Sequence, residues 1–461
     1  MKILLVQSWL GGDGPPVYPV GLACLAASLP GHDVSCFDPN VAAEPLAGLA
    51  ARVREFSPDL VGVSLRNIDS TNTRVNVSYL SPFARVVETV RREFAGPLVV
   101  GGSGFSMFAD RIMADFPAID YGVALEGERT FAALAAALAR PAGSDRPDGS
   151  AGPLRPDRPD GPHGPDGPEQ TAGPAADVAG VPSLHYRENG AVRFTGPAPA
   201  SPLADLPSPD FSVLPLAPYA TVPWGIGVET KRGCALACVY CPYGFLNGKA
   251  YRKKDPARVA DELWRLQEDF GLTRFTFLDS VFNFPRDQAM AVMQAMVDRK
   301  LTLSWSAWFT ERGLDREFLA LARRAGCDTV IFSPDAFGDR ALKRLGKATS
   351  VAEIKAAYRL VRDMGSFEVS YNFFKNPPGQ TLFAFLAMAG FVVRARLQMG
   401  RRAHFEFNSL RVEPHTALAK LAVAEGVVAP DADLLAPVMY SQKRTAYIEK
   451  CFDRLLQAAG K

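Results

Sequence analysis

The chain has 461 residues, of which 48% are hydrophobic and 22% are charged, and its formal net charge is only +2. This length accommodates two or three domains, and the composition is typical of a soluble globular protein. Because no basic tract stands out, nucleic acid is not expected as a partner. The N-terminus becomes polar too soon for a signal peptide, and no uninterrupted apolar run reaches about eighteen residues. We therefore expect a cytoplasmic protein without a membrane-spanning helix, whose thiols stay reduced.

Residues 1–140 alternate short apolar runs with segments of helical apolar spacing. Strands are predicted over Lys2–Gln7, Asp33–Phe37, Leu60–Leu65, Pro97–Val100 and Asp120–Val123, and helices over Pro19–Leu29, Phe83–Phe94 and Thr130–Ala139. This alternation predicts an α/β fold with a Rossmann-like, doubly wound parallel sheet. Ligands of such sheets lie at the carboxyl ends of the strands.

Residues 141–180 have a different composition. Three near-repeats, Arg146–Gly149, Arg158–Gly161 and Gly164–Gly167, contain no large apolar residue. Such a segment cannot bury enough surface to offset its ordering entropy, which predicts a disordered linker. Residues 181–220 then form a connector, which opens with a predicted hairpin over Ser183–Phe194.

Residues 221–415 alternate strands and helices again. Strands are predicted near Ile226–Thr230, Arg274–Asp279, Leu303–Trp308, Thr329–Ser333, Glu368–Phe374 and His404–Leu410. Six strand–helix units predict a partial (β/α)6 barrel rather than a complete eightfold one. Residues 416–461 are expected to form a C-terminal helical segment beside it.

Three of the seven cysteines, Cys234, Cys238 and Cys241, have C-x3-C-x2-C spacing directly after the first strand of this second domain. Thiolates suit iron–sulfur clusters, and three of them hold three corners of a cubane while leaving one iron open. Structural zinc takes four protein ligands, but no fourth Cys or His lies nearby. A disulfide is disfavoured by the odd count and the reducing compartment.

This motif resembles that of the radical S-adenosylmethionine (SAM) superfamily, including the aromatic Tyr240 before the third cysteine. The resemblance covers about residues 221–415. It implies a [4Fe–4S] cluster on the three cysteines, SAM bound to the open iron, and a 5′-deoxyadenosyl radical that abstracts hydrogen from the substrate. The SAM contacts that it implies are Tyr240, Asp279, Ser333, Asp335, Pro378 and Gly379. The loops that carry them are equally compatible with ordinary Pro/Gly turns.

The first domain resembles the cobalamin-binding subfamily of these proteins. The residues that carry this resemblance and are expected to contact cobalamin are Ser64, Leu65, Arg66, Gly101, Gly102, Glu126 and Gly127. Glycines at strand ends let the backbone approach a bulky ligand closely, although any tight strand-to-helix turn would use them too. The D-x-H-x-x-G loop that supplies a cobalt ligand in many cobalamin proteins is absent. Arg66 then lies either beneath the cobalt without coordinating it or in a salt bridge of a domain that has lost cobalamin.

Candidate residues for the substrate chemistry lie on the last two strands of the second domain. His404, Glu406 and Asn408 alternate with apolar residues, so they share one face of the sixth strand. If that face lines the barrel, His404 and Glu406 are candidates for proton transfer, with Tyr371 on the fifth strand as a weaker one. The alternative is a strand whose polar face meets solvent.

The leading functional hypothesis is a cobalamin-dependent C-methyltransferase that acts on a small natural-product intermediate. Its expected partners are this small-molecule substrate and an electron donor such as flavodoxin or ferredoxin. The first alternative is a radical SAM dehydratase or lyase of a sugar or polyol, similar to the diol dehydratases of aminoglycoside biosynthesis, which would not require cobalamin. The second is a non-catalytic corrinoid or redox sensor.

Overall fold

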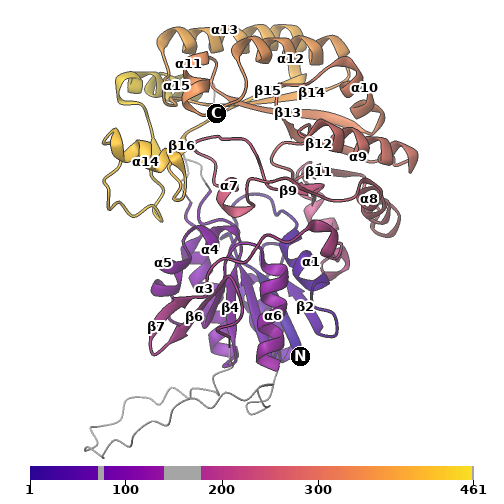
Figure 1. Ribbon diagram of the computed structural model, residues 1–461, viewed down its shortest axis with the longest axis vertical. Coiled ribbons are helices and arrows are strands. Elements are labelled where there is room, and N and C mark those ends of the chain that lie inside the picture. The colour runs from indigo at the N-terminus through magenta and orange to yellow at the C-terminus, as the bar shows by residue number, and fades with distance from the viewer. Residues whose placement is uncertain (71–76, 140–177, 459–461) are drawn as a thin grey trace, which may run out of the picture.

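The computed structural model describes residues 1–70, 77–139 and 178–458. Two lobes are stacked along the long axis, the N-terminal one below and the second one above in Figure 1. Most of the predicted linker, including the three near-repeats, lies outside the described residues.

The first lobe is built on a seven-stranded sheet of order β2-β1-β3-β4-β5-β6-β7. Its strands are β1 (Lys2–Gln7), β2 (Asp33–Phe37), β3 (Leu60–Ser64), β4 (Leu98–Gly101), β5 (Tyr121–Val123), β6 (Leu184–Glu188) and β7 (Ala191–Phe194). The first five are parallel. The helices are α1 (Val20–Ala27), α2 (Pro45–Phe56), α3 (Leu80–Glu93), α4 (Ser103–Met107), α5 (Ala109–Asp115) and α6 (Gly127–Ala139). Because helices cover both faces, the strands are apolar throughout: Ile3–Val6 are all buried.

The five predicted strands of this lobe are confirmed in chain order. The hairpin β6–β7 also forms, but it does not belong to a separate connector. Its first strand pairs antiparallel with β5, so the chain returns after the linker to complete the first sheet. The remainder of the connector packs on the same lobe, where the Tyr219 hydroxyl donates to Asp38 at 2.8 Å. The predicted boundary at residue 140 therefore falls inside the structural unit.

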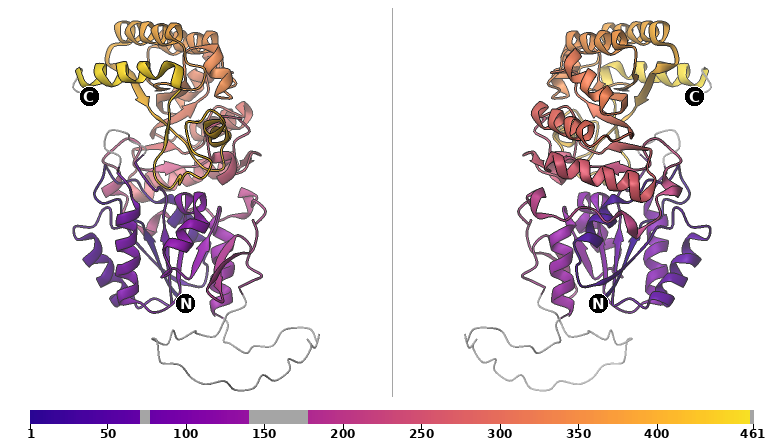
Figure 2. Two further views of the ribbon diagram at one scale, coloured as in Figure 1. Left: turned by 90° about the vertical axis from the view of Figure 1, so that its left-hand side faces the viewer. Right: turned by 90° about the vertical axis from the view of Figure 1, so that its right-hand side faces the viewer.

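The second lobe holds a six-stranded parallel sheet of order β15-β14-β13-β12-β11-β8. The strands are β8 (Gly227–Val228), β11 (Arg274–Phe277), β12 (Ser304–Phe309), β13 (Cys327–Asp335), β14 (Glu368–Phe374) and β15 (Ala403–Asn408). The helices that follow them are α8 (Pro256–Phe270), α9 (Arg286–Asp298), α10 (Arg316–Arg324), α11 (Asp339–Arg344), α12 (Val351–Met364) and α13 (Leu382–Met399). Figures 1 and 2 show these helices on the outer face of the curved sheet, as expected for a partial barrel.

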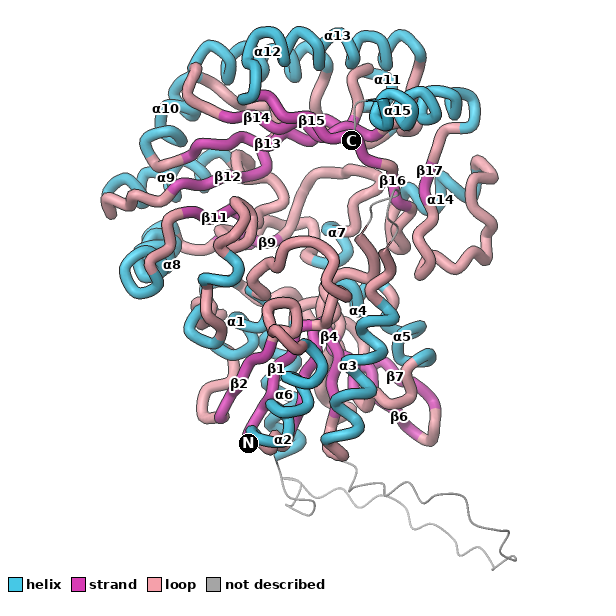
Figure 3. Tube along the Cα trace, turned by 180° about the vertical axis from the view of Figure 1, so that it is seen from behind, coloured by secondary structure: helices cyan, strands magenta, loops and turns pink. Residues whose placement is uncertain are grey.

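The C-terminal segment closes one flank of the barrel. It contains α14 (Ala417–Ala424), α15 (Ala446–Ala458) and the strand β17 (Met439–Tyr440), which pairs antiparallel with β16 (Leu410–Arg411) just after the barrel. The segment predicted as helical therefore also holds a strand, which Figure 3 shows beside α14.

One helix of the described part, Leu382–Arg402, is long and apolar enough by composition to cross a membrane. Arg394 and Arg396 interrupt its apolar run, so the segment is consistent with the expectation that no uninterrupted run reaches about eighteen residues. Its inner residues Phe391, Ala395 and Met399 are buried against the barrel. The helix is thus the outer cover of β14 and β15.

Candidate functional site

The three motif cysteines lie on one loop, residues Cys234–Cys241, at the carboxyl end of the barrel sheet. Main-chain bonds hold this loop from several sides: Cys234 N–H donates to Gly248 at 3.0 Å, and Val239 N–H donates to Leu345 at 3.0 Å. The loop also packs tightly against the end of α11, where a Cβ on Gly346 would lie 2.2 Å from the Ala237 carbonyl oxygen. Glycine is therefore required there, and the cluster loop, as we call it, is a fixed element.

The cysteines suit a cluster better than a single ion. None forms a disulfide; Cys234 is buried, and Cys238 and Cys241 are partly buried. Within the part of the chain that the structure describes, no three His, Cys, Asp or Glu side chains converge as one metal ion would need. The irons of a cubane are separate atoms, so its thiolates need not converge on one point. Burial raises the pKa of Cys241 to about 11, and bound iron would supply the charge that stabilises the thiolate.

Three of the expected SAM contacts form one network behind the cluster loop. The Tyr240 hydroxyl donates to the Asp335 carboxylate, which also pairs with Lys347. Lys347 donates in turn to the Ser333 carbonyl oxygen at 2.7 Å. Asp335 has a φ of +66°, a strained value for a residue other than glycine. Burial raises the pKa of Asp335, and Lys347 and Tyr240 counter this effect.

The other expected SAM contacts are engaged elsewhere. Asp279 is fully buried and accepts bonds from the Thr230 amide and from Lys231 Nζ, at 2.8 and 2.6 Å. It therefore ties the start of the cluster loop to β11. Pro378 and Gly379 are buried, and the Gly379 amide donates to Gln442 at 2.7 Å. These positions support the loop that follows β14, and their contact with SAM stays a prediction.

A chamber of about 830 Å³ lies between the two lobes. From the first lobe, Ser64, Arg66 and Gly102 line it, and from the second, Tyr240 and Cys241 do. Burial lowers the pKa of Arg66, but a guanidinium remains charged at any ordinary pH. The interdomain chamber thus joins the cluster loop to the carboxyl ends of the first sheet.

A second cavity of about 360 Å³ adjoins the chamber, lined mainly by the first lobe and also by Glu229, Arg232 and Leu278 of the second. The two spaces share lining residues, among them Gly21, Ser64 and Gly102. The walls of the smaller one are largely apolar, with Val63, Val99, Val123 and Phe131. A flat macrocycle with a nucleotide tail, such as a corrinoid, fits a wide space that continues into a narrow apolar one.

Glycine is needed at the carboxyl edge of the first sheet partly because the backbone itself packs too tightly there for a side chain. A Cβ on Gly102, whose φ is +100°, would lie 2.6 Å from the Leu65 carbonyl oxygen. Gly101 and Gly102 line the smaller cavity as expected. Leu65, in contrast, is fully buried in the core and lines neither cavity.

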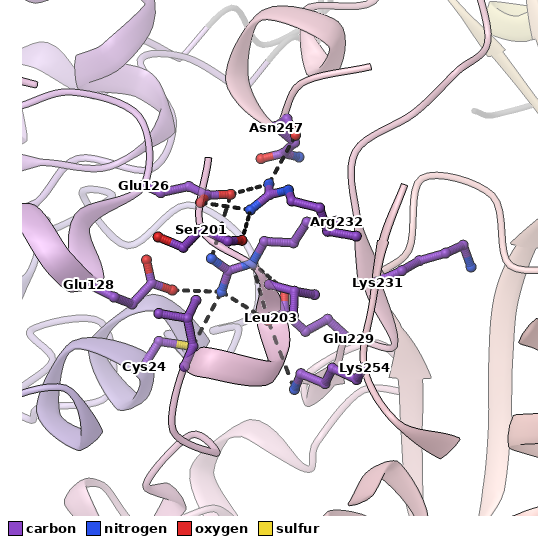
Figure 4. A network of polar contacts seen from close by, with 12 residues as sticks. Cys24, Glu126, Glu128, Ser201, Leu203, Glu229, Lys231, Arg232, Asn247 and Lys254 are labelled. Carbon is purple, nitrogen blue, oxygen red and sulfur yellow. Dashed lines mark hydrogen bonds and ion pairs between the residues drawn. The ribbon is translucent and has the colours of Figure 1, made fainter. Parts of the chain in front are cut away.

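The acidic segment Glu126-Gly127-Glu128 faces the second lobe. Figure 4 shows Arg232, which ends the short strand Lys231–Arg232 before the cluster loop, reaching toward it. Arg232 Nη2 lies 2.6 Å from Glu128 and 2.9 Å from Glu229, and Arg252 pairs with Glu126. Glu126 and Gly127 also line the smaller cavity. Glu126 is thus mainly a link between the lobes at the cavity wall, which the sequence alone did not indicate.

The expected catalytic residues are separated by the sheet. Tyr371 is fully buried on the helix-covered face, where its ring packs against Phe391 and Phe405. The structure thus places Tyr371 in the core, away from the lining of the interdomain chamber. His404 and Glu406 lie on the opposite face and are exposed, and neither lines the interdomain chamber. His404 is near the amino end of β15, 3.4 Å from Glu368.

Two acidic residues, Glu413 and Glu311, were not predicted from the sequence as site candidates. Glu413 lines the chamber, pairs with the buried Arg411, and has its pKa raised by burial. Arg411 also binds Asp69 of the first lobe at 2.8 Å. Glu311, just after β12, is buried, and its Oε1 has no hydrogen-bond partner among the described residues. Their place directly after barrel strands was a usable signal, since ligands of such sheets bind there.

Both lobes match models of known protein families. A family model of the radical SAM superfamily matches residues 228–392, and a model of the B12 binding domain matches residues 11–135. The uncharacterized methyltransferase PH0819 of Pyrococcus horikoshii is 27% identical over 80% of this chain and 74% of its own. The tryptophan 2-C-methyltransferase of Streptomyces laurentii is 26% identical over 70% of this chain, which spans 58% of that enzyme.

Solved structures match the whole architecture. The radical S-adenosylmethionine methyltransferase TsrM of Kitasatospora setae, with tryptophan and a SAM analogue bound, gives a TM-score of 0.75. The match covers 96% of this chain and 81% of that one at 22% identity. The same enzyme has also been solved with cobalamin and a [4Fe–4S] cluster. At this identity the likeness shows the fold, and both lobes share it.

Proposed function

We propose that this chain, which carries a radical SAM domain behind a B12-binding domain, is a cobalamin-dependent methyltransferase acting on carbon. The observation that supports it most is the interdomain chamber. Cys241 and Tyr240 reach it from the barrel, and Arg66 and Gly102 reach it from the first lobe. Two cofactors held by different lobes would therefore face the same space, as a reaction that uses both requires.

The chain's own residues would bind and orient these cofactors. Cys234, Cys238 and Cys241 would hold the cluster, and the Tyr240–Asp335–Lys347 network would fix the loop that carries it. When bound, the cofactors supply one-electron and methyl-transfer chemistry. Arg66 lines the chamber and would place a positive charge beside a corrinoid bound there.

The substrate would be a small molecule that shares the chamber. Glu413 is the carboxylate of the barrel lobe that lines it, and Arg411 holds that side chain in place at the domain boundary. We infer that Glu413 orients the substrate within the chamber. His404 and Glu406, on the helix-free face of the barrel sheet, stay candidates for proton transfer. We further propose that the substrate is a natural-product intermediate and that a flavodoxin- or ferredoxin-type protein donates the electron. The proposed location is the cytoplasm.

Isotope tracing tests this function directly. The anaerobic holoenzyme would be incubated with SAM labelled in its methyl group and with pools of small aromatic and nucleotide metabolites. A product heavier by one labelled methyl group, absent with Cys238→Ala and present with Cys451→Ala, is expected. SAM cleavage to 5′-deoxyadenosine with substrate dehydration and no methylated product would instead favour the lyase alternative.

A further inference from the structure

A short two-stranded ribbon joins the two ends of the segment that carries the cluster loop. β9 (Lys231–Arg232), which leads into the loop, pairs antiparallel with β10 (Arg252–Lys253), which follows it. Because each step along one antiparallel strand matches one step back along the other, this register places Tyr251 opposite Gly233. Tyr251 therefore lies across the ribbon from the start of the cluster loop, where Cys234 follows.

The two sides of this ribbon are in close backbone contact beside the first cysteine. A Cβ added at Gly233 would lie 2.0 Å from the Ala250 carbonyl oxygen, so only glycine fits there. The Cys234 amide donates to the Gly248 carbonyl oxygen at 3.0 Å. The backbone that leads to Tyr251 is thus held directly against the backbone that leads into the cluster loop.

The residue after Tyr251 is anchored from three directions. The guanidinium group of Arg252 pairs with Glu126 of the first lobe, and it donates to the carbonyl oxygens of Ser201 at 2.7 Å and Asn247 at 3.1 Å. Figure 4 shows these three partners grouped around it. The backbone position of Tyr251 relative to the cluster loop is therefore fixed.

The hydroxyl group of Tyr251 is buried and has no hydrogen-bond partner among the described residues. Its ring packs edge-on against Phe284, with the two centroids 5.9 Å apart. Burial raises the pKa of Tyr251 and the neighbouring Cys234 raises it further, while the Ala235 amide opposes both effects. An unpaired buried hydroxyl group is unfavourable, and a thiolate is a stronger acceptor than a thiol. A cluster on Cys234 would thus give this hydroxyl group its missing partner.

We propose that the Tyr251 hydroxyl group donates a hydrogen bond to the sulfur of Cys234 when that sulfur holds the cluster, and that this bond raises the cluster's reduction potential. This inference rests on the proposed function, since it presumes a cluster on the three cysteines. Hydrogen bonds to the sulfurs of a cluster tune its potential, because reduction adds negative charge that a donor stabilises. One electron from a donor protein would reduce the cluster, and no proton would move. Tyr251 acts through Cys234 and is therefore a positioning residue.

The test is a redox titration of the anaerobic holoenzyme with dithionite, followed by the electron paramagnetic resonance signal of the reduced cluster. Tyr251→Phe keeps the ring and its contact with Phe284 but removes the hydrogen-bond donor. The matched control is Tyr447→Phe, which makes the same change at an exposed tyrosine of α15. Iron analysis of each variant verifies that the cluster is complete.

Tyr251→Phe should retain its iron, and its midpoint potential should become more negative. At the midpoint potential of the unmodified protein, the ratio of reduced to oxidised cluster should fall at least about fivefold, while Tyr447→Phe leaves it unchanged. A merely structural role for Tyr251 would lower the iron content without moving the midpoint. An unchanged midpoint in Tyr251→Phe, or an equal shift in the control, would overturn the inference.

If Tyr251→Phe loses its cluster, replacing Tyr251 by 3-fluorotyrosine keeps the hydroxyl group and makes it a stronger donor. The midpoint potential should then rise above that of the unmodified protein, and an unchanged value would overturn the inference. An unmodified chain that binds no cluster at all would refute the proposed function instead.

Discussion

The hydroxyl group of Tyr240, one residue before the last cluster cysteine, donates a hydrogen bond to the carboxylate of Asp335 at the end of β13. Asp335 adopts a strained backbone conformation and also pairs with Lys347. The cluster loop and the fourth barrel strand are therefore locked together through one buried pair. Strain held in place by surrounding contacts is typical of functional sites.

The first prediction concerns this pair. Tyr240→Phe keeps the ring but removes the hydroxyl group, so Asp335 retains only Lys347. The variant should keep its iron content, and SAM cleavage should fall by about tenfold because the loop is less well positioned. Iron analysis and 5′-deoxyadenosine formation measure the two effects separately. Full activity in Tyr240→Phe would show that the bond has no positioning role.

The second prediction concerns the link between the lobes. Arg232→Ala leaves the carboxylates of Glu128 and Glu229 buried without their shared partner. Removing one partner of a buried ion pair leaves the other charge without compensation, so the free energy of unfolding should fall by about 3 kcal/mol. Urea titration measures this, with Arg265→Ala as the exposed control. A change no larger than in the control would mean that the network is not structurally important.

The third prediction concerns the cavities of the first lobe. A Cβ added at Gly21 meets no atom within 4 Å, although Gly21 lines both cavities. Gly21→Leu should therefore leave the melting temperature nearly unchanged while weakening corrinoid binding at least about tenfold. Gly390→Leu, which also meets open space on α13, is the matched control. Normal corrinoid affinity in Gly21→Leu would place the cofactor elsewhere.

The fourth prediction is a pH dependence. Burial raises the pKa of Glu311 from 4.5 to about 7. A carboxyl group whose pKa is raised in the folded state contributes stability that is complete below its unfolded pKa and is lost as the pH rises through about 7. Glu311→Gln should thus be more stable than the unmodified protein at about pH 8.5, by up to about 3 kcal/mol, and similar to it near pH 5. Unfolding curves at both pH values measure this difference. If Glu311→Gln and the unmodified protein differ in free energy of unfolding by the same amount at both, the raised pKa of Glu311 is contradicted.

Local patterns predicted most of the fold. Runs such as Ile3–Val6 are apolar on both faces because helices cover both, and the cysteine spacing alone located the cluster loop. Side-chain roles were harder to predict, since they depend on partners that lie far away in the sequence. Asp279 and Glu126 look like ligands at strand ends, yet the lysine and arginines that pair with them come from other elements.

For the barrel strands, the sequence did not indicate which side chains point toward the helices. Alternation along β14 and β15 predicted which residues share a face, but not which face the helices cover. Phe391 of α13 settles this by packing on Tyr371, so the aromatic stripe is core and the polar stripe of His404 and Glu406 is exposed. The hairpin β6–β7 joins the first sheet across a linker of about forty residues, a pairing that no local pattern encodes.

The central claim is that both lobes hold a cofactor, and the corrinoid content tests it most directly. The protein would be purified anaerobically from cells supplied with cobalamin, its iron quantified, and its corrinoid extracted and identified by mass. The account predicts a complete cluster together with about one corrinoid per chain. A complete cluster without any corrinoid would contradict it, and the first lobe would then be a scaffold rather than a cofactor domain.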